Sequence, residues 1–164
     1  MHKENDPVPE IYVHPGESHL VKAPTLMRTL LGSCVGITFL IPRLNVGALC
    51  HPMLPNYSVQ RARGRGAEAG CRYVDYAIRN LAQQFDALGA VRSEVQVKLF
   101  GGGDVLKVES HRTQPTVGML NSETALRVLE EEGFKIKISK LGGTTGMNIQ
   151  FHTGTGEVLL RWLG

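Results

Sequence analysis

A cysteine and a histidine lie near each other in the chain. The cysteine is a candidate nucleophile, and the histidine is a candidate base. Cys34 lies in the run LGSCVG at 31–36, and His51 lies in the run GALCHPMLP at 47–55. A cysteine attacks as the thiolate, and an unperturbed thiol has a pKa of about 8.5, so it needs a proton acceptor near neutral pH. An adjacent imidazole can accept that proton. The pair therefore indicates covalent catalysis with Cys34 as nucleophile and His51 as base.

The segments that carry the pair are predicted to form a β-hairpin. Residues 34–41 and 45–53 are apolar and rich in β-forming types, and the connection through Pro42 favours a turn. A loop centred between residues 42 and 43 places Cys34 directly opposite His51. Opposed side chains share a face of the sheet with Cβ atoms about 4.5–5.5 Å apart, and a shift of one residue would separate them. Cys50 is expected to point to the opposite face, into a core.

Composition predicts one cytoplasmic domain. The 164 residues are 42% hydrophobic, which suffices for one core, so we expect a mobile tail at 1–9 and a single domain at 10–164. No apolar run approaches the roughly 20 residues needed to cross a bilayer, and the amino-terminal residues are polar. We therefore expect neither a signal peptide nor membrane insertion.

The cysteines and charges argue against several kinds of site. Three cysteines without a CxxC pair indicate neither a disulfide framework nor a thiolate zinc site, and Cys50 and Cys71 are interpreted as buried structural residues. The histidines lack the spacing of metal ligands, so no metal and no cofactor are predicted. A net charge of +3 is too small to indicate nucleic-acid binding.

The remaining pattern predicts an α+β fold. The expected helices cover 71–88 and 121–132, the second with Ser122 as its cap and Gly133 as its stop. The other expected strands cover 11–14, 20–22, 95–100, 135–139, 147–152 and 157–162. Strands at both ends with helices between them indicate mixed, largely antiparallel sheet layers with about two main helices.

Two loops deserve separate interpretation. The glycines at 101–103 lack the lysine and hydroxyl residue of a phosphate loop, so we expect a tight strand exit bordering the catalytic cleft. Residues 56–70 are expected to form an exposed loop. Its Arg61, Arg63 and Arg65 are either simply solvated or form a docking loop for an acidic protein substrate, and RNA binding lacks the accompanying aromatic residues.

Several landmarks in order resemble the CheD family, the chemoreceptor glutamine deamidases of bacterial chemotaxis. The matching segments are LGSCV (31–35), HPMLP (51–55), RYVDYAI (72–78), KLFGGG (98–103), Gly142-Gly143 and TGEV (155–158). The resemblance implies a cysteine hydrolase on a fold shared with glutamine-deamidating bacterial toxins. It implies that methyl-accepting chemotaxis receptors are the substrates and that a CheC-type phosphatase is a possible partner.

The resemblance also implies residue roles. Cys34 and His51 match the family's catalytic pair, and the family uses a threonine a few residues before the cysteine, where this chain has Arg28 and Thr29. Thr29 is carried over as the third member. The expected mechanism passes through a Cys34 thioester, with backbone N–H groups around Gly32, Ser33 and Cys34 stabilising the oxyanion.

The chain departs from the family pattern in two places. It has VGMLN at 117–121 in place of an Ile-Gly-x-Arg-Asn run, and TGMN at 145–148 in place of a Gly-Arg-Lys-like run. These changes leave open an alternative in which the protein is a non-catalytic adaptor for a receptor or phosphatase, although the retained Cys34 and His51 argue against it. A thiol protease or transglutaminase shares the thioester chemistry but not the flanking motifs, and methyl ester hydrolysis is a possible side activity of the deamidase.

Overall fold

The computed structural model describes residues 5–57, 69–105 and 113–164. Its strands are β1 (Glu10–Tyr12), β2 (Ser18–Lys22), β3 (Leu26–Leu31), β4 (Val35–Ile41), β5 (Val46–Cys50), β6 (Gln96–Gly101), β7 (Ile136–Leu141), β8 (Met147–His152) and β9 (Val158–Trp162). The main helices are α3 (Val74–Ala87) and α4 (Val117–Glu131). Within these ranges, no helix is long and apolar enough to cross a membrane.

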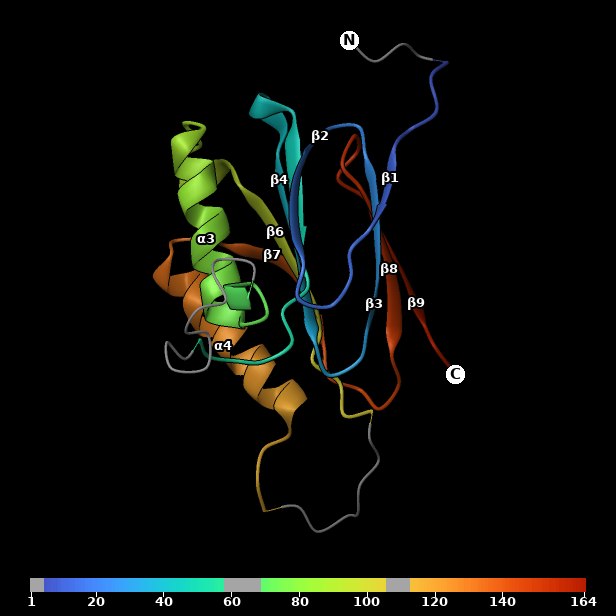
Figure 1. Ribbon diagram of the computed structural model, residues 1–164, viewed down its shortest axis with the longest axis vertical. Coiled ribbons are helices and arrows are strands. Elements are labelled where there is room, and N and C mark those ends of the chain that lie inside the picture. The colour runs from blue at the N-terminus through green and yellow to red at the C-terminus, as the bar shows by residue number, and fades with distance from the viewer. Residues whose placement is uncertain (1–4, 58–68, 106–112) are drawn as a thin grey trace.

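The strands form two sheets. One has the order β2-β5-β4-β6-β7 and the other the order β1-β3-β8-β9. Pairing is antiparallel except for β1 with β3 and β6 with β7, which are parallel. The predicted α+β class with mixed, largely antiparallel sheets and two main helices is therefore confirmed (Figure 1).

The five-stranded sheet is the middle layer of the protein. Figure 1 shows α3 and α4 against one of its faces and the four-stranded sheet against the other. Every residue of β4 and β5 is buried, as expected for strands covered on both faces. Phe39 packs with Phe85 and Phe134 in the core beneath the helices, whereas Leu49 and Phe151 belong to the core between the sheets.

The helices follow the predicted pattern with one correction. The apolar residues of α3 recur at helical spacing and its inward face is buried, as predicted. Ser122 is not the cap of the second helix, because α4 begins at Val117 and the Thr116 side chain accepts the Met119 N–H. The Ser122 hydroxyl instead donates to the Gly118 carbonyl inside the helix. Gly133 follows the helix with φ +82°, which fits its predicted role as the stop.

The hairpin of β4 and β5 forms, but its predicted register is wrong. Ile41 opposes Val46 and Ile37 opposes Cys50, so Cys34 is not opposite His51. The connection is longer than predicted because the 3₁₀ turn Pro42–Leu44 is followed by Asn45 in a left-handed conformation. The resulting displacement is two residues, which keeps the alternation of side chains within the ladder. Cys34 lies before β4 and His51 after β5, so both are outside the paired residues.

Candidate functional site

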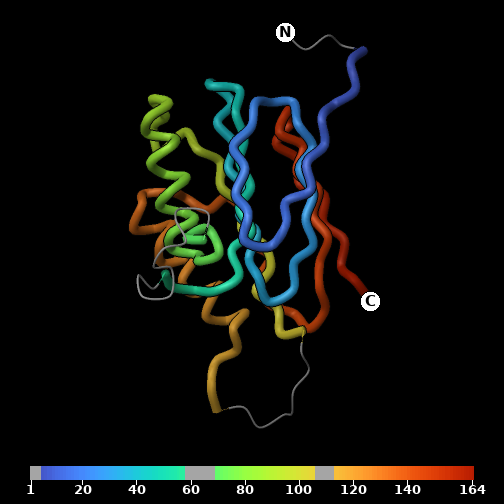
Figure 2. The backbone as a smooth tube through the Cα atoms, in the orientation of Figure 1, coloured from blue at the N-terminus to red at the C-terminus, as the bar shows by residue number. Residues whose placement is uncertain are grey.

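Cys34 lies in the tight turn through which the chain passes from the four-stranded to the five-stranded sheet, between β3 and β4 (Figure 2). The N–H of Gly102 donates to the Cys34 carbonyl and that of Gly103 to the Gly32 carbonyl, each at 2.9 Å. Gly101 has φ +101°, and a Cβ on it would lie 2.2 Å from the Cys34 carbonyl oxygen. The glycine run therefore forms the tight strand exit predicted from the sequence, and it holds the cysteine turn in place.

His51 directly follows β5 and is buried, with its imidazole against β3 of the other sheet. Its Nδ1 lies 2.7 Å from the Thr29 hydroxyl oxygen, and that hydroxyl donates to the Val13 carbonyl at 2.6 Å. A hydroxyl has a single hydrogen, and a carbonyl can only accept, so Nδ1 of His51 must be the donor to Thr29. This arrangement assigns the proton of neutral His51 to Nδ1 and leaves Nε2 with its lone pair.

The structure distinguishes Thr29 from its neighbour Arg28. The side chains of β3 alternate between buried and exposed, which places Thr29 inside and Arg28 on the outer face of the four-stranded sheet. Of these two residues, Thr29 is the one that hydrogen-bonds to the His51 side chain. Thr29, carried over from the family resemblance, is thus the one of the two residues that is placed to orient His51, and its catalytic role stays a prediction.

Burial keeps both members of the candidate pair uncharged. It raises the pKa of the Cys34 thiol, and it lowers the pKa of His51 to about 4, an effect that the Val13 carbonyl and Glu17 oppose. No hydrogen bond joins the thiol to the imidazole within the described ranges. At neutral pH the pair is therefore a thiol and a neutral imidazole, which suits proton removal during attack rather than a resting thiolate.

Cys50 lies in the core beneath the helices, away from Cys34 and His51. Its side chain lies in the core beneath α3 and α4, on the face of β5 away from His51, as the strand alternation predicted. Burial raises the pKa of Cys50 far above that of an ordinary thiol. Such a thiol is a packing residue and not a nucleophile.

A cavity of about 490 Å³ opens at Cys34. Ser33 and Asp104 contribute polar atoms, whereas much of the remaining wall consists of the apolar side chains of Met53, Leu54, Val105 and Val117. Met53, Leu54 and Val117 are exposed, although each is a large hydrophobic residue. The thiol thus lies at a hollow with an apolar rim, which is typical of a substrate-binding site.

The other expected site residues have different positions. Ser33 lines the cavity, and neither its N–H nor that of Cys34 donates to a backbone carbonyl among the described residues; the Cys34 N–H lies toward the sulfur of the same residue. Gly32 lies in the same turn.

Arg61, Arg63 and Arg65 lie outside the described residues. Of the two departing segments, 117–121 begins α4 at the cavity, whereas 145–148 leads into β8.

Sequence reasoning missed Asn121 as a site residue. Its side-chain amide donates to the carbonyls of Ser33 and Met53, at 2.9 Å each, and the residue is completely buried. The signal in the sequence was a polar amide at a position of α4 whose periodic neighbours, such as Ala125 and Val128, are core residues. The site thus takes Thr29 from one sheet, His51 from the other and Asn121 from a helix.

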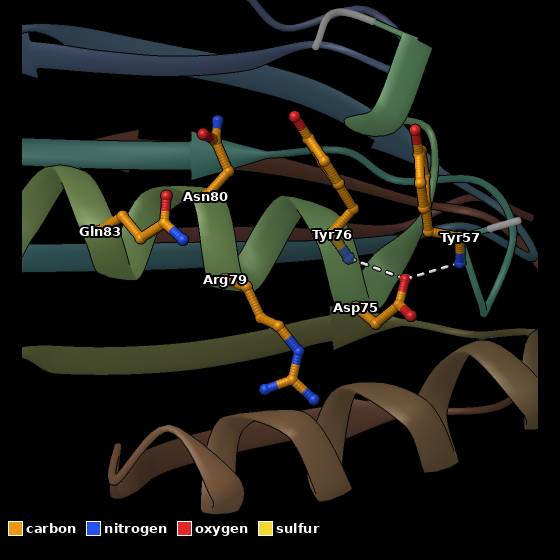
Figure 3. A pocket seen from close by; sticks show the side chains of 6 residues that line it. All are labelled: Tyr57, Asp75, Tyr76, Arg79, Asn80 and Gln83. Atoms are coloured by element: carbon orange, nitrogen blue, oxygen red, sulfur yellow. Dashed lines mark hydrogen bonds between the residues drawn. The ribbon is translucent and has the colours of Figure 1, made fainter. Parts of the chain in front are cut away.

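A second hollow lies beside α3 and has a structural explanation (Figure 3). The Asp75 carboxylate accepts the backbone N–H groups of Tyr57 and Tyr76, at 2.8 and 2.7 Å. Figure 3 shows Arg79 pointing toward α4, where it forms ion pairs with Glu131 and Glu132. The polar groups of this hollow therefore fix the start of α3 and bind the two helices together.

Comparison with known proteins gives consistent matches. The model of a family described as CheD chemotactic sensory transduction matches residues 53–162. A probable chemoreceptor glutamine deamidase CheD 2 of Geobacter sulfurreducens is 38% identical over 156 residues, covering 95% of this chain and 91% of that protein. A probable chemoreceptor glutamine deamidase CheD of Pseudomonas savastanoi pv. phaseolicola is 40% identical, covering 94% and 85%, respectively.

A solved structure shares the fold. YlmD from Geobacillus stearothermophilus matches with a TM-score of 0.50 and 15% sequence identity, over 76% of this chain and 50% of that chain. The present chain thus spans about half the length of that protein. At this sequence identity, the match supports a shared arrangement of sheets and helices and nothing about function.

Proposed function

Since the chain belongs to the CheD family, we propose that it is a protein-glutamine deamidase that converts glutamines of methyl-accepting chemoreceptors to glutamate. The observation that carries the proposal is the hydrogen bond between Thr29 and His51, because it fixes the direction and the tautomer of a neutral base in a protein whose Cys34 lines a cavity. An adaptor that only binds receptors has no need of this arrangement. Names of relatives at 32–40% identity supply the substrate class.

In the proposed first half-reaction, the Cys34 sulfur attacks the carboxamide carbon of a substrate glutamine. Nε2 of His51 accepts the thiol proton as the C–S bond forms, and the N–H groups of Ser33 and Cys34 stabilise the oxyanion. His51 then returns that proton to the amide nitrogen. The C–N bond breaks, ammonia leaves, and a thioester remains on Cys34.

The second half-reaction hydrolyses the thioester. His51 removes a proton from an incoming water molecule, whose oxygen attacks the thioester carbon. The C–S bond breaks, the proton passes to the departing thiolate, and the products are glutamate and the original thiol. The neutral resting state of His51 suits both steps, because the imidazole begins each of them as a proton acceptor.

Two finer proposals concern location and partners. We propose a cytoplasmic location, supported by the three free cysteines, because disulfides are characteristic of oxidising compartments. We also propose a CheC-type phosphatase as a regulatory partner, on the basis of family resemblance. In the alternative, the protein is a non-catalytic adaptor for the same partners and keeps the same fold. This alternative does not explain the hydrogen bond between Thr29 and His51.

The deamidase proposal is tested on purified receptor fragments. We expect mass spectrometry to show conversion of specific glutamines to glutamate, accompanied by release of ammonia. Cys34→Ala and His51→Ala should abolish the conversion, while Cys71→Ala, which removes a thiol away from the cavity, should retain it. Conversion that persists in the Cys34→Ala variant would overturn the mechanism, and receptor binding without any conversion would favour the adaptor.

A further inference from the structure

Asn121 joins the two parts of the site that must meet for catalysis. Its Nδ2 donates one hydrogen bond to the carbonyl of Ser33, directly before the cysteine, and a second to the carbonyl of Met53, two residues after the histidine. Both distances are 2.9 Å, and the side chain has no exposure to solvent. A single amide on α4 thus holds the nucleophile turn and the segment that follows His51.

The orientation of this amide is fixed by its partners. Both partners are carbonyls, which only accept, so the NH₂ group must face them and use both of its hydrogens. The Oδ1 atom is then buried without a partner among the described residues. An unpaired buried acceptor is costly, so its presence on the buried face of α4 calls for a role outside packing.

The bond to Ser33 also bears on the oxyanion site. The Ser33 carbonyl and the Cys34 N–H belong to the same peptide group, and in a trans peptide they point in opposite directions. Holding the carbonyl in the protein interior therefore holds the Cys34 N–H in a fixed direction. Among the described residues that N–H donates to no other residue and lies toward the sulfur of Cys34 itself, next to the atom that would attack the substrate.

The packing of α4 includes contacts besides those of Asn121. Gly118 lies against the glycine run, and a Cβ on it would lie 2.3 Å from the Gly103 oxygen and 2.5 Å from the Gly102 oxygen. The buried face of the helix adds Ala125, Val128 and Leu129 to the core. These contacts hold α4 in place in addition to the amide. The two hydrogen bonds of the amide therefore need an explanation of their own.

We propose that Asn121 is a positioning residue for the reaction: it holds the nucleophile turn and the histidine segment in the mutual geometry that proton transfer and oxyanion binding require. This inference rests on the proposed deamidase function for its substrate, but its geometric content concerns Cys34 and His51 alone. Asn121 touches neither the substrate nor the reacting atoms. Its effect is expected on the chemical steps and not on receptor binding.

The test compares Asn121→Ala with Ser122→Ala, a control on the same helix whose hydroxyl donates to the Gly118 carbonyl and packs against Gly102 without a hydrogen bond to the nucleophile turn. We expect Asn121→Ala to lower kcat for receptor deamidation by about 10- to 100-fold, because small displacements of reacting groups are costly, with KM changed less than about twofold. The pH dependence of Cys34 alkylation by iodoacetamide should shift as well. Ser122→Ala should stay within about twofold of the parent in all three measurements.

The alkylation measurement needs no receptor, so it separates this inference from the proposed function. A folded Asn121→Ala protein with unchanged kcat and an unchanged alkylation profile would overturn the positioning role. If the parent protein fails to deamidate receptors, a shifted alkylation profile in the variant still supports it. Should Asn121→Ala fail to fold, Asn121→Ser, which retains a single donor, replaces it, and parent-like values in that variant would count against the inference.

Discussion

Thr29 accepts the Nδ1–H of His51 at 2.7 Å while it donates its own hydrogen to the Val13 carbonyl at 2.6 Å. The two bonds fix both the direction of the imidazole and the position of its proton. They also connect the sheets, since Thr29 belongs to β3 and His51 follows β5. The base of the proposed reaction is thus aligned by a residue on the opposite layer of the sandwich.

Replacement of Thr29 should therefore affect turnover more than binding. Thr29→Val keeps the shape but removes the hydroxyl, which frees the imidazole to change tautomer, and we expect kcat to fall by about 10- to 100-fold. Thr29→Ser retains the hydroxyl and should recover much of the rate. Steady-state kinetics on a receptor fragment gives both values. Equal rates for the valine and serine variants would contradict this role, and Arg28→Ala, on the exposed face, serves as the control.

The depressed pKa of His51 predicts a stability change at mildly acidic pH. The folded pKa is about 4 and the unfolded value is about 6.5, so the unfolded chain binds the proton first as the pH falls. The free energy of unfolding should therefore decrease as pH falls from about 6.5 toward 4, by about 2 kcal/mol between pH 7 and pH 5 from this residue alone. Denaturant titrations at the two pH values measure it.

The contribution of His51 can be separated from that of other groups. A His51→Gln variant lacks the imidazole, so its loss of stability between pH 7 and pH 5 should be smaller than that of the parent by the same amount. Identical pH dependence in the two proteins would mean that burial does not depress the His51 pKa.

The raised pKa of Cys34 predicts slow alkylation at neutral pH. Because burial raises the pKa of Cys34 and so favours the thiol over the thiolate, iodoacetamide should modify Cys34 more slowly than free cysteine at pH 7. The rate should still be rising at the pH where the rate for free cysteine levels off. Mass spectrometry of the labelled protein follows the reaction. Cys50, completely buried, should react only after unfolding. Rapid labelling of Cys34 at pH 6 would instead reveal a resting thiolate–imidazolium pair.

The sequence was sufficient to predict which face of the hairpin carries the pair, because side-chain alternation depends only on parity. Cys34 and His51 lie toward the sandwich interior and Cys50 lies beneath the helices, as expected. The register was wrong because loop length is set by local geometry. The 3₁₀ turn and the left-handed Asn45 add residues that composition does not reveal.

Contacts across layers could not be predicted in the same way. The distinction between Thr29 and Arg28 depends on the pairing of β3 with β8, and the bonds of Asn121 depend on where α4 lies against the β3–β4 turn. Each requires the packing of segments separated by tens of residues. Local pattern predicts the elements but not which atoms of two distant elements come within hydrogen-bonding distance.

The apolar rim of the cavity predicts how a substrate is held beside Cys34. Val117 is a cavity residue that is 43% exposed, and burial of such a side chain against a receptor segment favours binding. Val117→Asp places a charge that must be desolvated when the receptor docks, so we expect kcat/KM for receptor deamidation to fall by about tenfold, mainly through KM. The alkylation rate of Cys34 should change little, because iodoacetamide makes no use of the rim.

Leu126 provides a matched control for Val117. It is also an apolar residue of α4, with 42% exposure, but it does not line the cavity. Leu126→Asp introduces the same charge on the same helix, so any general effect of the change in net charge should appear in both variants. A loss of kcat/KM in Val117→Asp alone would assign the effect to substrate contact. Equal losses in the two variants would show that the rim takes no specific part in receptor binding.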